Sequence, residues 1–292
     1  MMRAPRLPIP GETVKGSMFK IGPGGKGSNQ GVAAHRAGAD TTMITKIGDD
    51  EFAPIALNSF KMEEMTTDYI FKDKNSSTGA ALIMVDENTG QNKIIVTLGA
   101  SDKITREEID SAKDQIITAD ILLMQLETNM EALKHAISIA NANGVPIILN
   151  PAPADILPDD ILSKVDYLTP NESEASVLCR FPVETNEDLI KAGQYFLKKG
   201  VKNIIFTLGE KGAFLMNQSK QKMFSAFEVK VIDTTGAGDA FNGGLATALA
   251  EKMPLDQAVI FANAVGALNV TKIGTAPAMP FRKEINELIE KN

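Results

Sequence analysis

Residues 233–241 have the sequence Asp-Thr-Thr-Gly-Ala-Gly-Asp-Ala-Phe, and the rest of the chain is best interpreted outward from this stretch. It follows a short apolar run at 229–232, which we expect to be a strand, and it opens a helix expected over 237–251. Gly236 and Gly238 allow a tight turn that brings bare backbone N–H groups to the start of that helix. Such a start attracts phosphate through its free donors and its dipole. The pattern predicts a phosphate-binding turn in an α/β protein.

Asp239 lies in the first turn of the predicted helix. In isolation it would be interpreted as a helix-stabilising charge, because the helix dipole favours acidic residues there. Beside two glycines and a predicted anion-binding turn, its carboxylate is also placed to act as a general base. The strand–turn–helix context favours this second interpretation.

The remainder of the C-terminal two thirds alternates short apolar runs with amphipathic stretches. The expected strands are 121–126, 146–149, 165–168 and 204–208, and the expected helices are 105–116, 128–144, one that starts at 170–171, 186–199, 255–271 and 282–290. Capping boxes are predicted at Thr105 with Glu108 and at Thr128 with Glu131. The alternation indicates a doubly wound, mostly parallel α/β sheet flanked by helices.

Three segments depart from this alternation, at 13–21, 79–85 and 93–98. The last two flank a turn-rich stretch and predict a hairpin. We expect a single domain over 1–292, with a small β-sheet lid whose strands are inserted at about 13–21 and 79–98. A second hairpin is expected from 213–216 to 222–227.

Composition excludes several classes of protein. The 292 residues carry a net charge of −7, which argues against a nucleic-acid partner because phosphate backbones attract basic surfaces. No apolar run is long enough to cross a membrane. The single cysteine, Cys179, permits no intrachain disulfide, so we expect a cytoplasmic protein. His35 and His135 lack a second ligand at metal spacing, which argues against zinc.

The glycine-rich stretch at 22–27, Gly-Pro-Gly-Gly-Lys-Gly, also matches the dinucleotide-binding fingerprint. That fingerprint should close a buried strand, and the preceding residues 11–16 are too polar for one. A P-loop is excluded as well, because Gly25 and Lys26 are followed by Gly27 instead of Ser or Thr.

Four segments together resemble the ribokinase, or phosphofructokinase-B, family of carbohydrate kinases. The segment 24–30, Gly-Gly-Lys-Gly-Ser-Asn-Gln, is similar to the family's sugar-binding motif. Residues 169–174, Thr-Pro-Asn-Glu-Ser-Glu, resemble its Asn-x-x-Glu motif, and 207–212, Thr-Leu-Gly-Glu-Lys-Gly, its nucleotide loop. Residues 233–241 resemble its C-terminal signature. The motifs occur in the family's order and the resemblance covers about 8–289.

The resemblance implies an ATP-dependent phosphotransferase that acts on the hydroxymethyl group of a small sugar, with D-ribose as the first expectation. A kinase for 2-deoxyribose or another small sugar remains an alternative. A hypothesis of another class is a catalytically weak or inactive homologue that only binds sugar or nucleotide. Mg²⁺ and an activating K⁺ are the implied cofactors, and the implied assembly is a homodimer formed through the lid.

The resemblance also assigns roles to individual residues. Asp239 would take the proton from the attacking hydroxyl, and Gly236, Ala237 and Gly238 would stabilise charge on the phosphoryl group. The sugar would be bound by Gly25, Lys26, Gly27, Ser28, Asn29, Glu127 and Asp239. The nucleotide would be bound by Asn171, Thr207, Leu208, Gly209, Glu210, Lys211, Gly212, Gly238 and Asn263. Glu127 has an equal alternative as an acid at a helix start.

The implied metal sites use two further sets. Glu174 would approach Mg²⁺ directly or through water, although Asn171 and Glu174 are also placed to cap a helix. The activating cation would be held, mostly through backbone carbonyls, by Asp233, Thr235, Asn269, Lys272, Gly274 and Ala278. Ala278 stands where the family pattern leads us to expect serine.

The front of the chain departs from the family pattern. Members begin with an apolar strand and an Asn-x-Asp sugar-binding element, and residues 3–8 resemble only the end of that element. We expect that Met1 is an internal methionine of a longer protein. The alternative is a shortened homologue with weak or no activity.

Overall fold

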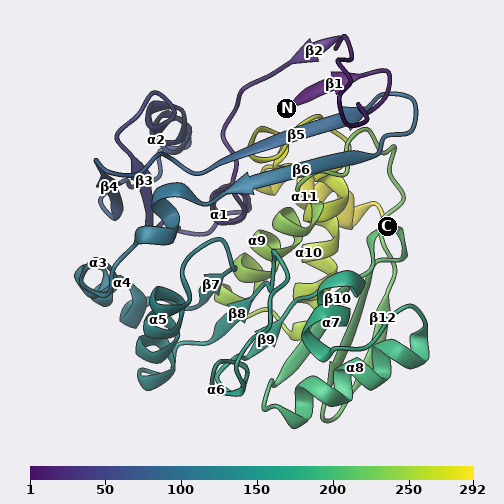
Figure 1. The fold of residues 1–292 in the computed structure, drawn as a ribbon. Helices are drawn as coiled ribbons and strands as arrows, with labels where there is room; N and C mark the ends of the chain where they lie inside the picture. The colour runs from purple at the N-terminus through teal and green to yellow at the C-terminus, as the bar shows by residue number, and fades with distance from the viewer.

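A six-stranded sheet forms the centre of the computed structural model, which describes residues 1–292 with the side chain of Asn92 excepted (Figure 1). In spatial order the strands are β12 (Gln221–Phe224), β11 (Ala213–Asn217), β10 (Asn203–Thr207), β9 (Tyr167–Leu168), β8 (Ile147–Leu149) and β7 (Leu122–Met124). β7 to β10 pair in parallel, and β11 and β12 complete an antiparallel edge. The predicted α/β class, these strands and the second hairpin are confirmed.

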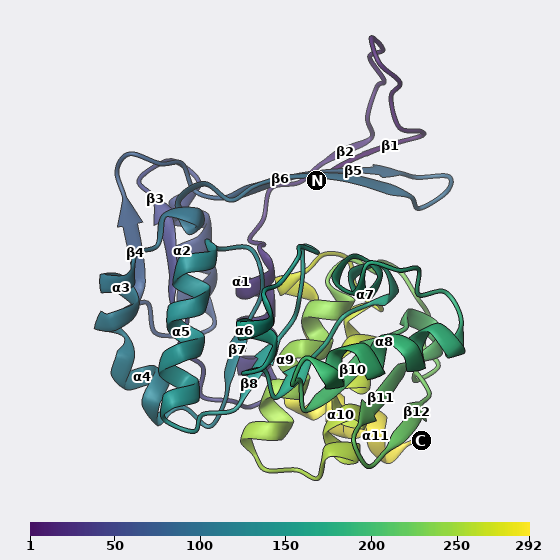
Figure 2. The same ribbon diagram turned by 60° about the horizontal axis from the view of Figure 1, so that its bottom comes forward.

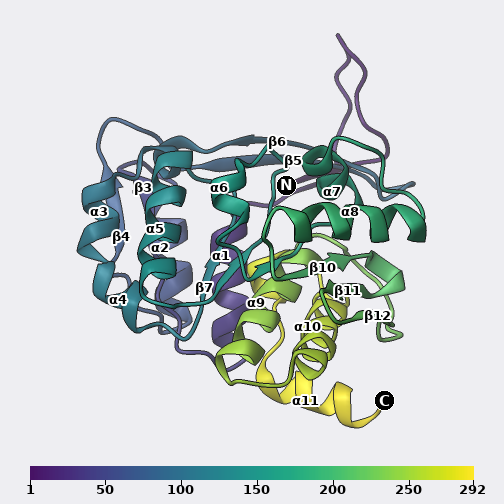
Figure 3. The same cartoon turned by 90° about the horizontal axis from the view of Figure 1, so that it is seen from below.

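Helices cover both faces of this sheet, and the strand residues alternate between the two resulting cores. Ile147 and Leu149 of β8 face the first core, while Ile148 faces the second. The first core is built with α3 (Arg106–Ser111), α4 (Lys113–Thr118), α5 (Met130–Ala142), α6 (Asp159–Leu162), α7 (Glu172–Cys179) and α8 (Asn186–Lys198). The second is built with α1 (Lys26–Arg36), α2 (Ala53–Met62), α9 (Ala237–Ala250), α10 (Leu255–Asn269) and α11 (Arg282–Glu290). Figure 3 shows α5, α6 and α8 on one side of the strands and α9, α10 and α11 on the other.

Two further strands stand apart from the main sheet. β3 (Thr45–Gly48) and β4 (Ile70–Asp73) form a separate parallel pair. A short 3₁₀ helix at Gly99–Lys103 then leads into α3. The doubly wound arrangement is therefore present, but the described strands form two sheets here and not one.

The predicted lid is a four-stranded sheet that extends over one edge of the molecule (Figure 2). Its order is β2 (Met18–Phe19), β1 (Met2–Ala4), β5 (Ala80–Asp86) and β6 (Asn92–Thr97). The β5–β6 hairpin agrees with the prediction, whereas the expected strand over 13–21 is reduced to two residues. β1 was not predicted as a lid strand, and it lies between β2 and β5, antiparallel to the first and parallel to the second.

Three local predictions were wrong. Residues 229–232 form no strand: β12 is the edge of the sheet, Ile232 donates instead to the Val270 carbonyl at the end of α10, and its side chain is exposed. The helix expected over 105–116 is broken at Ala112 into α3 and α4. The capping box at Thr128 is absent because Asn129 caps α5, while Thr128 donates to the Ser101 carbonyl.

Candidate active site

Asp239 lies in the first turn of α9 and is only 7% exposed. Its Oδ2 accepts a hydrogen bond from Nδ2 of Asn29 at 2.8 Å, and its Oδ1 accepts one from Nε2 of Gln30 at 3.0 Å. Both donors belong to α1, which can approach α9 closely because Gly243 has no side chain. A Cβ at Gly243 would lie 2.5 Å from that of Ala33. The absence of a side chain at Gly243 thus allows the amides of Asn29 and Gln30 to reach the Asp239 carboxylate.

Gln30 joins Asp239 to the ends of two sheet strands. Its Nε2 also reaches Oδ1 of Asn150 after β8, at 3.0 Å, and its Oε1 accepts from Nε2 of Gln125 after β7, at 2.7 Å. Asn150 in turn donates to the Thr169 carbonyl after β9. Gln30 lies within the predicted sugar-binding motif at 24–30, but no role was predicted for it. The missed signal was a polar residue at the carboxyl end of three predicted parallel strands, Gln125 within one of them and Asn150 and Thr169 directly after the others, where such sheets place ligand contacts.

Glu127 contacts the start of α1. Its Oε2 accepts a hydrogen bond from the backbone N–H of Lys26 at 2.7 Å. Gly25, the N-cap of α1, has φ +89°, which a residue with a side chain rarely adopts. Glu127 lies before the N-cap of its own helix, Asn129, so the alternative of a first-turn acid of α5 is not what the structure shows. The Glu127 carboxylate therefore accepts a hydrogen bond from the start of α1, and it lies beside the predicted sugar-binding loop.

Three carboxyls share this region, that of Asp239 buried and those of Glu127 and Glu174 half-buried. Burial raises the pKa of Asp239, of Glu127 and of Glu174 above their ordinary values. The nearby charge of Lys26 opposes each of these increases. Asp239 further raises the pKa of the other two by like-charge repulsion. The single ammonium of Lys26 therefore faces three carboxyls. The negative charge that remains favours the binding of an additional cation.

The start of α9 has the predicted tight turn, in which Gly236 adopts a left-handed backbone conformation with φ +85°. Gly238 borders open space, since an added Cβ there would meet nothing within 4 Å. The N–H of Ala237 is already engaged with the Thr234 carbonyl at a long 3.3 Å. Of the two glycines in this turn, Gly238 therefore has the more open surroundings, since an added Cβ at Gly236 would lie 3.3 Å from Thr275.

The predicted nucleotide residues lie along the ends of β9 and β10. Asn171 and Thr207 form an isolated parallel bridge. Asn171 and Glu174 make a reciprocal capping box at the start of α7, with Oδ1 accepting from the Glu174 N–H at 2.8 Å and Oε2 from the Asn171 N–H at 2.9 Å. The alternative role predicted for Asn171 and Glu174, the capping of a helix, is thus present in the structure. Capping occupies one oxygen of Glu174 and leaves the other for a further contact.

The loop after β10 turns through Gly209 and Gly212, which have φ +58° and +95°. Glu210 and Lys211 are exposed on it, whereas the side chain of Leu208 is buried in the core. Leu208 can therefore contact a ligand only through its backbone. Asn263 of α10 is buried and donates to the Ser225 carbonyl beyond β12, at 3.2 Å.

The residues predicted to bind a monovalent cation also come together. Oδ1 of Asp233 accepts from the N–H and hydroxyl of Thr235, and Oδ2 accepts from the N–H of Gly274 at 3.1 Å. Asn269 is fully buried, and its Oδ1 has no partner among the described residues. The side chain of Lys272 is directed to an ion pair with Glu284, so this lysine offers a cation only its backbone. Ala278 is buried beside them in a short 3₁₀ turn.

A cavity of about 1520 Å³ lies beneath the lid. The predicted site residues that line this cavity are Gly25, Lys26, Gly27, Ser28, Asn29, Glu127, Asp233, Thr235, Gly236, Asp239 and Gly274. Lid residues such as Ile83 and Ile94 also border it. The predicted nucleotide residues 171, 207–212 and 263 are outside this lining. The structure therefore joins the sugar-binding set to the glycine turn, and leaves the nucleotide set on the neighbouring strand ends.

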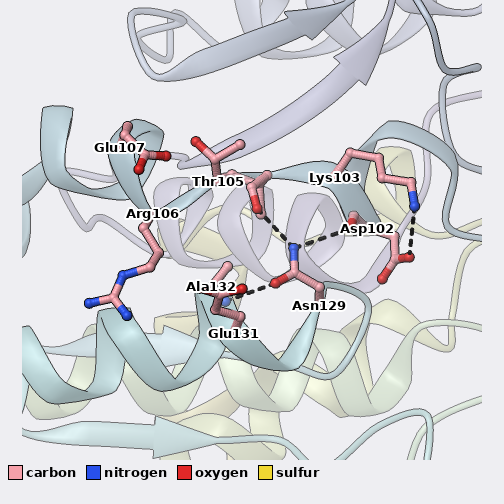
Figure 4. Close-up of a pocket in the computed structure, with 9 residues that line it drawn as sticks. Asp102, Lys103, Thr105, Arg106, Glu107, Asn129, Glu131 and Ala132 are labelled. Carbon is pink, nitrogen blue, oxygen red and sulfur yellow. Dashed lines mark hydrogen bonds and ion pairs between the residues drawn. The ribbon is translucent and has the colours of Figure 1, made fainter.

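A second pocket, between the starts of α3 and α5, is smaller at about 410 Å³ (Figure 4). Asn129 lies at its centre, and its Nδ2 donates to the carbonyls of Asp102 and Ile104 while its Oδ1 caps α5. These polar atoms are engaged in joining two segments of the fold, so we assign this pocket a structural role.

Within the described part of the chain, no group of three or more His, Cys, Asp or Glu side chains is placed to hold a metal ion by itself. No described helix is long and apolar enough to cross a membrane.

Comparison with known proteins decides the family. The model of the pfkB family of carbohydrate kinases matches residues 2–282. This chain belongs to that family. It is a carbohydrate kinase, and hence a phosphotransferase, as the resemblance of its four motifs implied.

Individual relatives agree over nearly the whole chain. A ribokinase of Haemophilus influenzae is 40% identical over 290 residues, covering 99% of this chain and 94% of the relative. A deoxyribokinase of Salmonella typhi is 36% identical, with coverage of 98% and 94%. Among solved structures, Arabidopsis thaliana ribokinase complexed with ribose and ATP has a TM-score of 0.92 at 31% identity, covering 99% of this chain and 94% of that one. This likeness bears out the predicted ribokinase-like fold.

Proposed function

We propose that this carbohydrate kinase transfers the terminal phosphoryl group of ATP to the hydroxymethyl group of D-ribose, giving D-ribose 5-phosphate and ADP. The observation that carries the proposal is Asp239, a buried carboxylate in the first turn of a helix, held by two side-chain amides beneath a lid. The similarity to ribokinases, one of them complexed with ribose and ATP, supports the choice of substrates.

In this proposal Asp239 accepts the proton of the attacking hydroxyl while the oxygen approaches phosphorus. The hydrogen bonds from Asn29 and Gln30 fix the carboxylate, so that little reorientation is needed at the moment of transfer. Oδ1 of Asn29 is buried and has no partner among the described residues, which leaves it to accept a sugar hydroxyl. Glu127, Lys26 and the backbone of Gly25 complete the hydroxyl-binding surface.

The start of α9 would stabilise the negative charge on the transferring phosphoryl group. Space is open around Gly238, where an added Cβ would meet nothing within 4 Å, and its N–H would donate to the phosphoryl group with support from the helix dipole. Thr207, Gly209 and Lys211 on the loop after β10, together with Asn171 and Asn263, would hold the nucleotide. Glu210, Leu208 and Gly212 shape that loop.

The donor set fits Mg²⁺ bound mainly by phosphate oxygens and water, since one buried and two half-buried carboxyls face a single ammonium. Glu174 would hold the ion directly or through water. When bound, Mg²⁺ would neutralise charge on the phosphates and help to align them.

The cluster around Asp233 fits an activating K⁺. Asn269 supplies a buried oxygen without a partner among the described residues, and Thr235, Lys272, Gly274 and Ala278 have backbone carbonyls nearby. Such a cation would fix the loop that leads into Gly236 and so stabilise the turn at the start of α9.

The test is release of ADP, measured in a coupled assay with ATP, Mg²⁺ and K⁺ on D-ribose, 2-deoxyribose, fructose and adenosine. The variant Asp239→Asn should lose about 10²–10⁴-fold in turnover if the carboxylate is the general base. Turnover on ribose that survives this substitution would contradict the assignment. Binding of ribose or ATP without turnover would instead favour a protein that only binds these ligands.

A second candidate substrate is 2-deoxyribose, which the similarity to a deoxyribokinase favours. The two sugars differ by one hydroxyl, and a site built to hydrogen-bond that hydroxyl would discriminate against the sugar that lacks it. The ratio of kcat/KM for the two sugars in the same assay decides between them.

We also propose that two chains associate through the lid, within an architecture that forms one domain over 1–292. Ile94, Ile95 and Val96 of β6 are all exposed, together with Leu82 of β5, so both faces of the lid carry apolar surface. A bound sugar would cover one face, and a second lid would cover the rest. A cytoplasmic location accords with the free, buried thiol of Cys179.

A further inference from the structure

The loop at 274–279 contacts both the proposed cation site and the glycine turn at the start of α9. Its Gly274 N–H donates to Oδ2 of Asp233 at 3.1 Å. Its Thr275 packs against Gly236, where an added Cβ would lie 3.3 Å from the Thr275 side chain. The position of this loop therefore affects both the cation site and the turn that would bind phosphate.

Arg36, the last residue of α1, bonds to the same loop. Its Nη1 donates to the Met279 carbonyl at 2.7 Å and, over a longer 3.3 Å, to the Pro277 carbonyl. The guanidinium carbon also lies 4.7 Å from the centre of the Phe281 ring, which is a cation–π contact. The start of α1 carries the amides that hold the candidate catalytic carboxylate, and its last residue holds the loop.

Glu63, at the end of α2, fixes the guanidinium of Arg36. Its two carboxylate oxygens accept from Nε at 2.8 Å and from Nη2 at 2.5 Å, in a two-pronged pair. The side chains of Arg36 and Glu63 are only 12% and 15% exposed, so little water competes with the pair. A paired fork of this kind fixes direction as well as charge. Glu63 also neutralises Arg36, which would otherwise repel a cation bound nearby.

The carbonyl groups of the loop are divided between these contacts. The turn itself uses the carbonyls of Thr275 and Ala276, which accept from backbone N–H groups three residues later. Arg36 engages two more. No described residue donates a hydrogen bond to the carbonyl of Gly274 or of Ala278. These two carbonyls belong to the set predicted to hold the monovalent cation, and they are available to it.

Met279 extends the contact of Arg36 to Asn269. The Met279 side chain is buried, and its sulfur accepts from Nδ2 of Asn269 at 3.6 Å. Oδ1 of the same amide is buried and has no partner among the described residues. Arg36 therefore holds the backbone of the residue whose side chain orients the Asn269 amide.

We propose that Arg36 is a positioning residue for the monovalent cation of this kinase. Fixed by Glu63, its guanidinium holds the loop at 274–279 so that the available carbonyls and the amide oxygen of Asn269 are arranged for one ion. The inference rests on the K⁺ site proposed above and adds to it a cationic residue, which cannot bind the ion itself. Without the guanidinium, the loop carbonyls would reorient and the ion would bind more weakly.

The experiment compares Arg36→Met with Arg282→Met, since methionine keeps an unbranched apolar stem. Arg282 is the matched control. It too pairs with a glutamate, Glu251, and lies over a phenylalanine ring, that of Phe261 at 4.9 Å. It also donates to the Ala37 carbonyl just after α1, at 3.0 Å. It has no hydrogen bond with a described residue of the loop at 274–279.

Melting temperature and ADP release are each measured against K⁺ concentration, with choline chloride keeping the ionic strength constant. A bound cation raises the melting temperature by mass action, so this readout needs no turnover. The half-saturating K⁺ concentration should rise at least about fivefold in Arg36→Met and less than about twofold in Arg282→Met, because only the first variant loses the hydrogen bonds that orient the loop. Saturating K⁺ should restore much of kcat in Arg36→Met. A purely structural role would lower the melting temperature without changing the half-saturating concentration.

A half-saturating concentration that changes equally in the two variants, or in neither, would overturn the proposal and leave the K⁺ site in place. An unsubstituted chain that phosphorylates ribose without responding to K⁺ in either readout would overturn both the K⁺ site and this inference, but not the kinase activity. If Arg36→Met fails to fold, Glu63→Gln is measured instead, because it keeps the guanidinium and removes the charge that fixes it. We then expect at least about a threefold increase in the half-saturating concentration. An unchanged value would overturn the proposal.

Discussion

At the scale of single residues, burial dominates the chemistry of Asp239. The carboxylate is removed from water, and this raises its pKa, while Lys26, Asn29 and Gln30 partly oppose the increase. A general base must be ionised before it can accept a proton. The same burial that isolates the reaction from water therefore limits the pH range in which this residue can act.

The first prediction is the pH dependence of turnover. Because the pKa of Asp239 is raised, kcat/KM on the sugar should fall as the pH is lowered, with a midpoint above the ordinary value for aspartate of about 3.9. The profile is measured between about pH 4.5 and 9 by ADP release. An acid limb absent down to pH 4.5 would contradict a raised pKa in the catalytic base.

The second prediction concerns stability. A group whose folded pKa is raised stabilises the fold below its unfolded pKa, and this contribution is lost as the pH rises through the folded pKa. At pH 7.5 Asp239→Asn should therefore raise the melting temperature while it removes activity, and the gain should shrink near pH 4. Asp68→Asn, at an exposed position whose carboxylate makes no hydrogen bond with any described residue, is the control and should change little. An unchanged or lower melting temperature for Asp239→Asn at pH 7.5 would refute this expectation.

The third prediction tests Gln30 as a positioning residue. Gln30→Leu removes a donor from Asp239 and leaves the amides of Gln125 and Asn150 without their partner. Leaving buried polar groups unpaired costs about 1–3 kcal/mol of unfolding free energy. We expect that loss together with a lower kcat and a smaller change in KM. Gln194→Leu on the exposed face of α8 is the matched control. A kcat unaffected by Gln30→Leu would show that the network serves folding alone.

At the scale of elements, the contact between α1 and α9 depends on where glycine is placed. Gly243 faces α1 so closely that an added Cβ would lie 2.6 Å from the Gln30 carbonyl, which is backbone and cannot move aside. Gly266 in α10 also lies within a helix, but its nearest neighbour would be 3.4 Å away. Gly243 is therefore required for the close packing of two helices, whereas the position of Gly266 has space for a side-chain methyl group.

The fourth prediction uses this pair. Gly243→Ala should destabilise the fold by about 1–3 kcal/mol, as overpacking does, and should disturb the amides that hold Asp239. Gly266→Ala should be neutral or stabilising by up to about 1 kcal/mol, through helix propensity. Chemical denaturation of both variants gives the comparison. Equal effects at the two positions would mean that α1 and α9 separate at little cost.

At the scale of the whole molecule, the lid is the least covered part of the fold. Ile95 of β6 is 66% exposed, although an apolar sheet face is normally packed against something. The fifth prediction is that Ile95→Asp shifts the chain from dimer to monomer in light scattering. Met62→Asp, at an 83% exposed position on α2, is the control and should leave the assembly unchanged. A monomer before substitution would remove the dimer proposal.

Local patterns determined much of this protein. Most strands and helices of the C-terminal two thirds, the capping box at Thr105, the glycine turn before α9 and the four family motifs could be predicted from the sequence, because each depends on neighbouring residues. The predictions at Thr128 and at residues 229–232 were wrong because such short patterns are compatible with more than one local structure. Asn129 caps α5 in place of Thr128, and the apolar run bonds through the Ile232 N–H to the end of α10 and not to a strand.

Only the tertiary structure decided which distant residues meet. The hydrogen bonds from Gln30 to Asp239 and Asn150 span 209 and 120 positions of the chain, and the one from Gln125 to Gln30 spans 95. No local pattern encodes such contacts, since they follow from the way helices pack across a sheet. The placement of β1 in the lid and the separation of the β3–β4 pair from the six-stranded sheet arise for the same reason. Which strands pair depends on the tertiary fold, because the fold determines which strand edges are free and which sheet faces are covered.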